Sequence, residues 1–302
     1  PPMKNDWLSL LVFAACYVLF VVIPARRSWV ACGGAVVLVL LGVISWPDAL
    51  GRMINWNVMG LFWGTLILAE LFMLSRVPAV LAEWLVDRTA TARAAMLGLC
   101  ALSGLISMFV ENVAVVLLVA PVALSLCEKL KLNPAPLLIG IAVSSNLQGT
   151  ATMIGDPPSM ILAGYLRLNF FDFLWYQGRP SIFFAVEVGA LASLLVLAYI
   201  FRRHREEIRL VAVEQARSWL PTGLLVALIL GLSVATLFDP AFAWFAGVYT
   251  LALAGMGLAW LTWRARWERP GRLLALLDWD TTFFLMGVFV SGGALSASGW
   301  LD

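Results

Sequence analysis

The sequence predicts an all-α polytopic membrane protein, and three observations lead to this fold class. Of the 302 residues, 62% are hydrophobic and only 13% are charged, a balance that soluble globular domains do not have. Apolar stretches of membrane-spanning length recur along the whole chain. Tryptophans cluster at the ends of these stretches, as in an interfacial belt.

Each predicted span is an apolar run bounded by polar or aromatic residues. Arg26 and Arg27 follow the first run rather than precede it, so this run is a span and not a signal peptide. In chain order, we expect spans at Trp7–Ile23, Val30–Ile44, Val58–Leu74, Leu137–Tyr165, Ile182–Phe201, Leu220–Phe238, Phe242–Trp263 and Thr282–Ser298.

The segment Ala94–Cys127 has two apolar limbs with Glu111 and Asn112 between them. Basic residues flank both of its ends, which places the two ends on the same side of the membrane. We therefore expect residues 94–127 to form a re-entrant helical hairpin with Glu111 and Asn112 at its tip.

The span 137–165 is long enough to cross a bilayer, but it cannot be one unbroken helix. Pro157 and Pro158 lack N–H groups, and Gly149 and Gly155 weaken the turns before them. Non-helical backbone at membrane depth occurs only where protein or a watery cavity satisfies its polar groups. The sequence therefore predicts a broken helix whose unwound middle lines a binding site near the midplane.

The positive-inside rule sets the orientation. An outside N-terminus with alternating spans places sixteen of the 20 Lys and Arg residues on the inner side. We expect a multi-pass protein of a bacterial inner membrane, with the lipid bilayer as its surroundings. The basic residues lie in short loops, so the sequence gives no indication of nucleic-acid binding.

A repeat with an offset of 223 residues relates Asn55-Trp56-Asn57 and Gly64 to Asp278-Trp279-Asp280 and Gly287. By the count of basic residues, the first copy begins on the outer side of the membrane and the second on the inner side. This predicts an inverted-repeat transporter; chance similarity of the two segments is the alternative.

Residues 1–201 would hold the first repeat with a linking span, 202–218 a cytoplasmic basic loop, and 219–302 the start of the second repeat. Because the second copy ends before a hairpin and a broken helix, we expect a truncated repeat lacking roughly 120 residues.

Two motifs resemble the ion-transporter superfamily, which includes arsenite permeases, NhaD-type sodium–proton antiporters, the pigmentation P protein and dicarboxylate symporters. Residues 107–118, SMFVENVAVVLL, resemble its first hairpin, and residues 149–158, GTATMIGDPP, resemble its second signature in the arsenite-permease and P-protein branch. The resemblance implies two inverted repeats, each with a hairpin and a broken helix, and a homodimer. Glu111 replaces a serine of the dicarboxylate branch, which makes sodium–carboxylate symport less expected.

The resemblance also implies roles for single residues. Asn112 matches the hairpin-tip asparagine that contacts cation or substrate, and Ser107 matches a hydroxyl one helical step before it. A sodium ion would bind near Ser107, Asn112 and Gly149. The expected ion- or substrate-binding residues are Ser107, Glu111, Asn112, Asn146, Gly149, Thr150, Thr152 and Asp156.

The chemistry of these residues favours exchange at one site. Glu111 and Asp156 are carboxyl groups in apolar segments, where ionisable residues are functional by default. Burial favours their protonated form and a bound cation favours the ionised form, so H⁺ and a cation would compete. Asp156 could instead simply cap the second half-helix, and Glu111 could pair with an arginine. Glu70 and Glu187 also fall within spans, and we expect Glu70 to be structural.

These observations favour a secondary active transporter of a small inorganic ion or oxyanion-type solute, in the arsenite/antimonite or sodium–proton exchange class, coupled to Na⁺ or H⁺ and needing no other cofactor. An uncoupled, channel-like permease is the alternative. An intramembrane aspartyl protease is a remote one, because Met153 stands where the Gly-x-Gly-Asp signature has its first glycine. We expect no enzymatic activity, and no phosphate-binding loop supports an ATP-driven pump.

Overall fold

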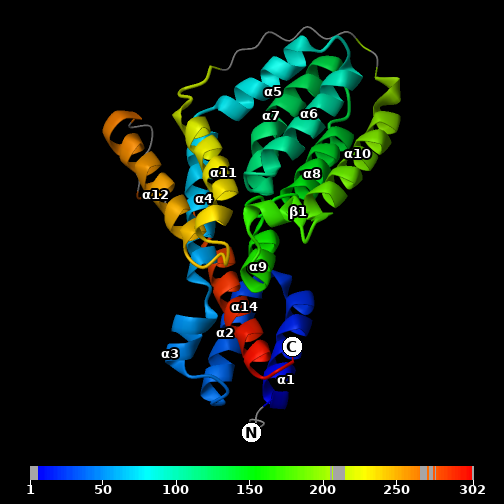
Figure 1. Cartoon of the computed structure of the whole chain (residues 1–302). Helices are drawn as coiled ribbons and strands as arrows, with labels where there is room; N and C mark the ends of the chain where they lie inside the picture. Colours follow the sequence, from blue (N-terminus) through cyan, green and yellow to red (C-terminus); the bar gives the residue numbers. More distant parts are fainter. Residues whose placement is uncertain are drawn as a thin grey trace. The chain divides into compact units, whose positions relative to one another are not determined.

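The computed structural model describes residues 6–204, 206, 215–265, 271, 275 and 277–300. These residues form two compact units, residues 1–59 with 276–302 and residues 60–275 (Figure 1). Nearly all of the described secondary structure is helical, which confirms the predicted fold class. Within the described residues, five helices are long and apolar enough to cross a membrane, or six if a bent pair of helices counts as one span.

The first unit is built on three packed helices and a short connecting segment. Its elements are α1 (Asp6–Val22), η1 (Pro24–Arg26), α2 (Arg27–Leu40), α3 (Trp46–Asp48), η2 (Ala49–Met53) and α14 (Trp279–Ala297). Helix α14 packs along α2, and α1 packs against both. The chain bends by 119° between α1 and the residues from Pro24 onward, so the first two predicted spans are two short helices joined at a sharp turn.

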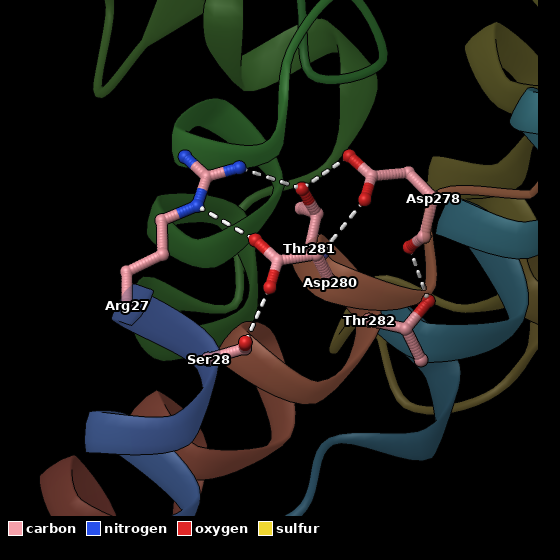
Figure 2. Close-up of polar contacts among 6 residues, drawn as sticks. All are labelled: Arg27, Ser28, Asp278, Asp280, Thr281 and Thr282. Carbon is pink, nitrogen blue, oxygen red and sulfur yellow. Dashed lines mark hydrogen bonds and ion pairs between the residues drawn. The ribbon is translucent and has the colours of Figure 1, made fainter. Parts of the chain in front are cut away.

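A polar cluster joins the first turns of α2 and α14 (Figure 2). Arg27 Nε lies 3.3 Å from Asp280 Oδ2, and Arg27 Nη2 donates to Thr281 Oγ1 over 3.0 Å. Ser28 Oγ donates to Asp280 Oδ1. Asp278 Oδ1 accepts from the Thr281 backbone N–H over 2.9 Å and so caps α14. These bonds place the N-terminal ends of the two helices together.

The second unit holds the predicted hairpin and broken helix, with α6, α7, α8 and α10 side by side in Figure 1. Its helices are α4 (Trp56–Leu74, from Gly60), α5 (Val77–Arg88), α6 (Ala92–Ser107), α7 (Asn112–Leu130), α8 (Ala135–Gly149), α9 (Pro157–Leu166), η3 (Phe170–Phe173), α10 (Ile182–Ile200), η4 (Phe201–Arg203), α11 (Leu220–Phe238), α12 (Phe245–Trp260) and η5 (Leu261–Ala265). The strands β1 (Trp175–Tyr176) and β2 (Arg179–Pro180) pair antiparallel.

Helix α5 is an element that the apolar-span prediction did not include. It carries Glu83, Asp87 and Arg88 together with buried Val77, Ala82 and Val86, so it is amphipathic rather than uniformly apolar.

The predicted span Phe242–Trp263 begins three residues later than expected, because α12 starts at Phe245. Asp239, in the preceding loop, accepts N–H bonds from Ala243, Trp244 and Phe245 over 2.8–2.9 Å. These bonds satisfy free N–H groups at the N-terminal end of α12 and so fix where this helix begins.

The predicted repeat has a counterpart in local structure. Helix α4 begins at Trp56 and α14 begins at Trp279, and the residue before each tryptophan caps the helix; Asn55 Oδ1 accepts from the Val58 N–H over 3.1 Å. A Cβ added to Gly64 would lie 2.8 Å from the Thr250 carbonyl carbon in α12. One added to the equivalent Gly287 would lie 2.5 Å from that of Ala31 in α2.

In each copy of the predicted repeat, the third helix therefore packs on the second helix of the other copy: α4 packs on α12, and α14 packs on α2. Gly60, Gly64 and Leu71 of α4 meet Gly247, Thr250 and Gly257 of α12 in the same order, so the two helices run parallel. Helices α2 and α14 start together and also run parallel. Both relations agree with the predicted alternation of spans. The orientation in a membrane and the boundaries 1–201, 202–218 and 219–302 stay predictions, and much of 202–218 lies outside the described residues.

Candidate functional site

The hairpin tip is the break between α6 and α7. Helix α6 ends at Ser107, residues 108–111 are not helical, and α7 begins at Asn112. Glu111 caps α7, since Oε1 accepts from the Val113 N–H over 3.2 Å and Oε2 from the Ala114 N–H over 3.0 Å. A carboxylate at a helix N-terminus satisfies free N–H groups and meets the positive end of the helix dipole. This role of Glu111 was not predicted from the sequence.

The predicted break in the span 137–165 is confirmed. Helix α8 ends at Gly149, α9 begins at Pro157, and residues 150–156 between them are not helical. Asp156 Oδ1 accepts from the Ser159 N–H over 3.0 Å, so the capping role expected as an alternative is present. Pro157 and Pro158 occupy the first turn of α9, where a missing N–H costs nothing.

Three hydrogen bonds tie the hairpin tip to the broken helix. Asn112 Nδ2 donates to Asn146 Oδ1 over 2.9 Å, and Ser145 Oγ donates to the Asn112 carbonyl over 3.1 Å. Thr152 Oγ1 donates to the Met108 carbonyl. The two breaks in the helical backbone therefore form one polar assembly.

Two glycines allow the backbones of this assembly to meet. A Cβ on Gly155 would lie 2.2 Å from the Gly149 carbonyl oxygen and 2.9 Å from that of Ser107. A Cβ on Gly149 would lie 3.5 Å from Ser107 Oγ and 3.8 Å from Asp156 Oδ2. Ser107 is fully buried, and its hydroxyl has no hydrogen-bond partner among the described residues. A buried hydroxyl, a carboxyl group and close carbonyls thus converge here.

A small cavity of about 10 Å³ adjoins these groups, with room for about one water molecule. Glu111 and Asp156 both line it, and α4 contributes Thr65 and an apolar wall that includes Phe62. Within the described part of the chain, neither lysine nor arginine lines it. The contribution of α4 was not predicted, because a uniformly apolar helix gives no signal of which face meets a site.

The eight predicted site residues all lie at the hairpin tip or at the helix break. Ser107, Gly149 and Asp156 come together, Glu111 and Asp156 share a cavity, and Asn112 binds Asn146. Gly149 is the last residue of α8, and Thr150, Thr152 and Asp156 lie in the non-helical segment after it. The Thr150 hydroxyl donates to the Leu147 carbonyl over 2.8 Å, as that of Thr152 does to Met108. The roles of these residues in binding stay predictions.

Comparison with known proteins agrees with this architecture. Residues 17–302 match the family model described as citrate transporter, CitMHS. An uncharacterized transporter of Mycobacterium tuberculosis is 30% identical over 303 residues, covering 97% of this chain and 68% of the relative. Magnetosome protein MamN of Magnetospirillum gryphiswaldense is 28% identical over 98% of this chain and 68% of its own.

A protein of Dictyostelium discoideum with the provisional designation transporter arsB is 27% identical over 177 residues, which is 59% of this chain and 31% of that protein. The family match covers nearly the whole chain and includes the hairpin, the broken helix and α14. The chain therefore belongs to the CitMHS citrate transporter family of the ion-transporter superfamily, and it is a membrane transporter.

Proposed function

We propose that this transporter is secondary active, moves a small inorganic cation or hydroxylated solute past Glu111 and Asp156, and couples the movement to H⁺ or Na⁺. The lining of the cavity carries the proposal. It has two carboxyl groups and a threonine hydroxyl, and no basic residue among those described. Hard oxygen ligands suit small hard cations or neutral hydroxylated solutes such as arsenous acid, and they disfavour anions.

The capping bonds support exchange at a fixed site. Both carboxyl groups are anchored at the starts of α7 and α9, where the helix dipoles favour their negative charge. A cation or a proton can then enter and leave while the oxygens stay in place. Competition between the two would link their movements in opposite directions, as sodium–proton or solute–proton exchange requires.

The description of the family makes citrate a solute to be tested. Free citrate would bring negative charge against Glu111 and Asp156. The N–H groups of Val113, Ala114 and Ser159, which could otherwise bind an anion at a helix start, already donate to the two caps. The geometry therefore supports a cation or a neutral solute better than a free carboxylate anion.

The test is proton flux in inside-out vesicles that carry the full-length natural protein. A pH gradient is imposed, and sodium, lithium, arsenite or citrate is added in turn to wild type and to Glu111→Gln. Glutamine keeps a carbonyl oxygen that can cap α7 but removes the charge. Glu128→Gln is the matched control, because Glu128 is an exposed carboxyl at the other end of the same helix.

We expect one solute to dissipate the gradient in wild type and in Glu128→Gln, and Glu111→Gln to abolish the effect. Equal rates in all three proteins would refute the role of Glu111. Solute flux without proton or sodium movement would replace exchange with an uncoupled permease. Dissipation by citrate alone would overturn the assignment of a cation or neutral solute.

A further inference from the structure

A second polar cluster lies where α6, α8 and α10 meet, and the proposed function does not use it. Ser144 and Gln148 are one turn apart on α8, and Glu187 is on α10. Gln148 Nε2 lies 3.5 Å from Glu187 Oε2, at the upper limit for a hydrogen bond. Before Tyr199, Glu187 and Ser193 are the only polar residues of α10, so Glu187 is the one ionisable group in this part of the helix.

Three oxygens of this cluster are buried without a hydrogen-bond partner in the described structure: Ser144 Oγ, Gln148 Oε1 and Glu187 Oε1. Ser144 and Gln148 are more than nine-tenths buried, with exposed fractions of 6% and 9%. Buried polar atoms in folded proteins are almost always paired. The amide and carboxylate oxygens can only accept, so a hydrogen-bond donor or a cation has to satisfy them, and of these only a proton or a cation also neutralises the Glu187 carboxylate.

Two members of the cluster, Ser144 and Gln148, line a cavity of about 10 Å³, which is space for about one water molecule or one small ion, and Glu187 lies next to it through its contact with Gln148. Ser144 and Gln148 line it from α8, Ser193 from α10, and Cys100 and Gly104 from α6. A Cβ on Gly104 would lie 2.8 Å from Gln148 Cγ. The absence of a side chain there lets the glutamine occupy its position beside the cavity.

The elements packed against Glu187 bring no positive charge to it. Helix α8 has no titratable residue, and α6 has Arg93 in its first turn and Cys100 at the cavity. On α10, Tyr199 is three turns away, and the arginines of η4 begin 15 residues after Glu187, about 22 Å along a helix. Among the described residues of these elements, the carboxyl group has no countercharge. An ionisable group in a span without a partner marks an ion or proton site.

We propose that Glu187, Gln148 and Ser144 form a binding site for one exchangeable monovalent cation, H⁺ or Na⁺, separate from the cavity of Glu111 and Asp156. A cation there balances the charge of Glu187 and gives a partner to the buried oxygens that have none. Gln148 directly precedes Gly149, where α8 ends, so the occupant acts on the helix break that carries the first site. As the coupling-ion site of the transporter, it rests on the proposed function; as a cation site, it does not.

The experiment measures the thermal unfolding midpoint of the purified full-length protein in sodium chloride and in choline chloride, each at an acidic and an alkaline pH. All variants also carry Glu111→Gln and Asp156→Asn, so both carboxylate charges of the first cavity are removed. We expect the midpoint to rise with each tenfold increase in sodium, or with acidity if the occupant is a proton. Adding Glu187→Gln abolishes this dependence, and adding Glu128→Gln leaves it unchanged.

A second variant keeps the charge. Ser144→Ala should raise the sodium concentration needed for half of the shift about fivefold, as expected for one lost oxygen ligand. The proposal is overturned if the midpoint responds to neither sodium nor acidity, or if the response survives Glu187→Gln. Transport by Glu111→Gln is scored separately, so loss of the proposed function and loss of this site are distinguishable.

Discussion

Replacing Gly155 by alanine tests whether the close backbone approach at the helix break is needed. The added Cβ would lie 2.2 Å from the Gly149 carbonyl oxygen and 2.9 Å from that of Ser107. Real Cβ contacts almost never fall below 3.0 Å, so the Gly149 oxygen would have to move by at least 0.8 Å (3.0 − 2.2). Both obstacles are backbone atoms, so no side-chain rotation relieves the clash.

The movement has a cost in stability and a larger one in function. Overpacking that shifts the backbone lowers the free energy of unfolding by about 1–3 kcal/mol. Each kcal/mol lowers the thermal unfolding midpoint by about 2–4 °C in a chain of this size class. Because Gly149 lies beside Ser107 Oγ and Asp156 Oδ2, moving it also changes the geometry of the ion site. A displacement of this size can lower a rate about 100-fold where positioning is needed.

The assay combines the thermal midpoint with the vesicle flux for Gly155→Ala and for a matched control, Gly189→Ala. A Cβ on Gly189 in α10 would meet only Leu147, at 3.8 Å, an ordinary contact. Alanine at this helical position should be neutral or stabilising by about 0.5–1 kcal/mol. A Gly155→Ala protein with wild-type midpoint and flux would refute the argument that this approach holds the site.

Three further predictions concern helix caps and helix contacts outside the candidate site. Burial works to raise the pKa of Asp239, but its three backbone N–H bonds hold that pKa below its usual value; the stabilisation is therefore complete above roughly pH 4 and lost as the pH falls through the lower folded value. Asp239→Ala should cost about 0.5–2 kcal/mol at neutral pH and flatten the acid limb of the midpoint against pH; an unchanged curve would contradict this. Gly287→Ala should lower the midpoint by forcing α14 away from Ala31, where the new Cβ would lie 2.5 Å from a carbonyl carbon; a wild-type midpoint would disprove that contact. A double-mutant cycle on Arg27 and Asp280, with side chains 47% and 51% exposed, should give a coupling of at most about 1 kcal/mol that falls with salt; a larger, salt-independent value would show that the pair is effectively buried.

The break in the helix 135–166 could be predicted from sequence because Pro157, Pro158 and two glycines act locally on the backbone. The cap made by Glu111 follows from where α7 starts, which the apolar pattern around it did not reveal. The place of Thr65 at the site and the pairing of Gln148 with Glu187 depend on which helix faces meet. Uniformly apolar helices carry no periodicity from which those faces could be read.

The two copies of the predicted repeat share a helix cap and a close glycine contact but differ in chemistry, and burial accounts for the difference. Helices α4 and α14 each start at a tryptophan, and the residue before it caps the helix. Each helix meets its neighbour closely at a glycine, Gly64 in α4 and Gly287 in α14. Asn57, only 7% exposed, occupies the position equivalent to Asp280, whose side chain is 51% exposed and pairs with Arg27. A neutral amide can be buried at far lower cost than a carboxylate. Residue roles therefore cannot be copied from one repeat to the other by offset alone. Each position has to be read with its own burial and its own charged neighbours, as with Glu187 and the oxygens around it.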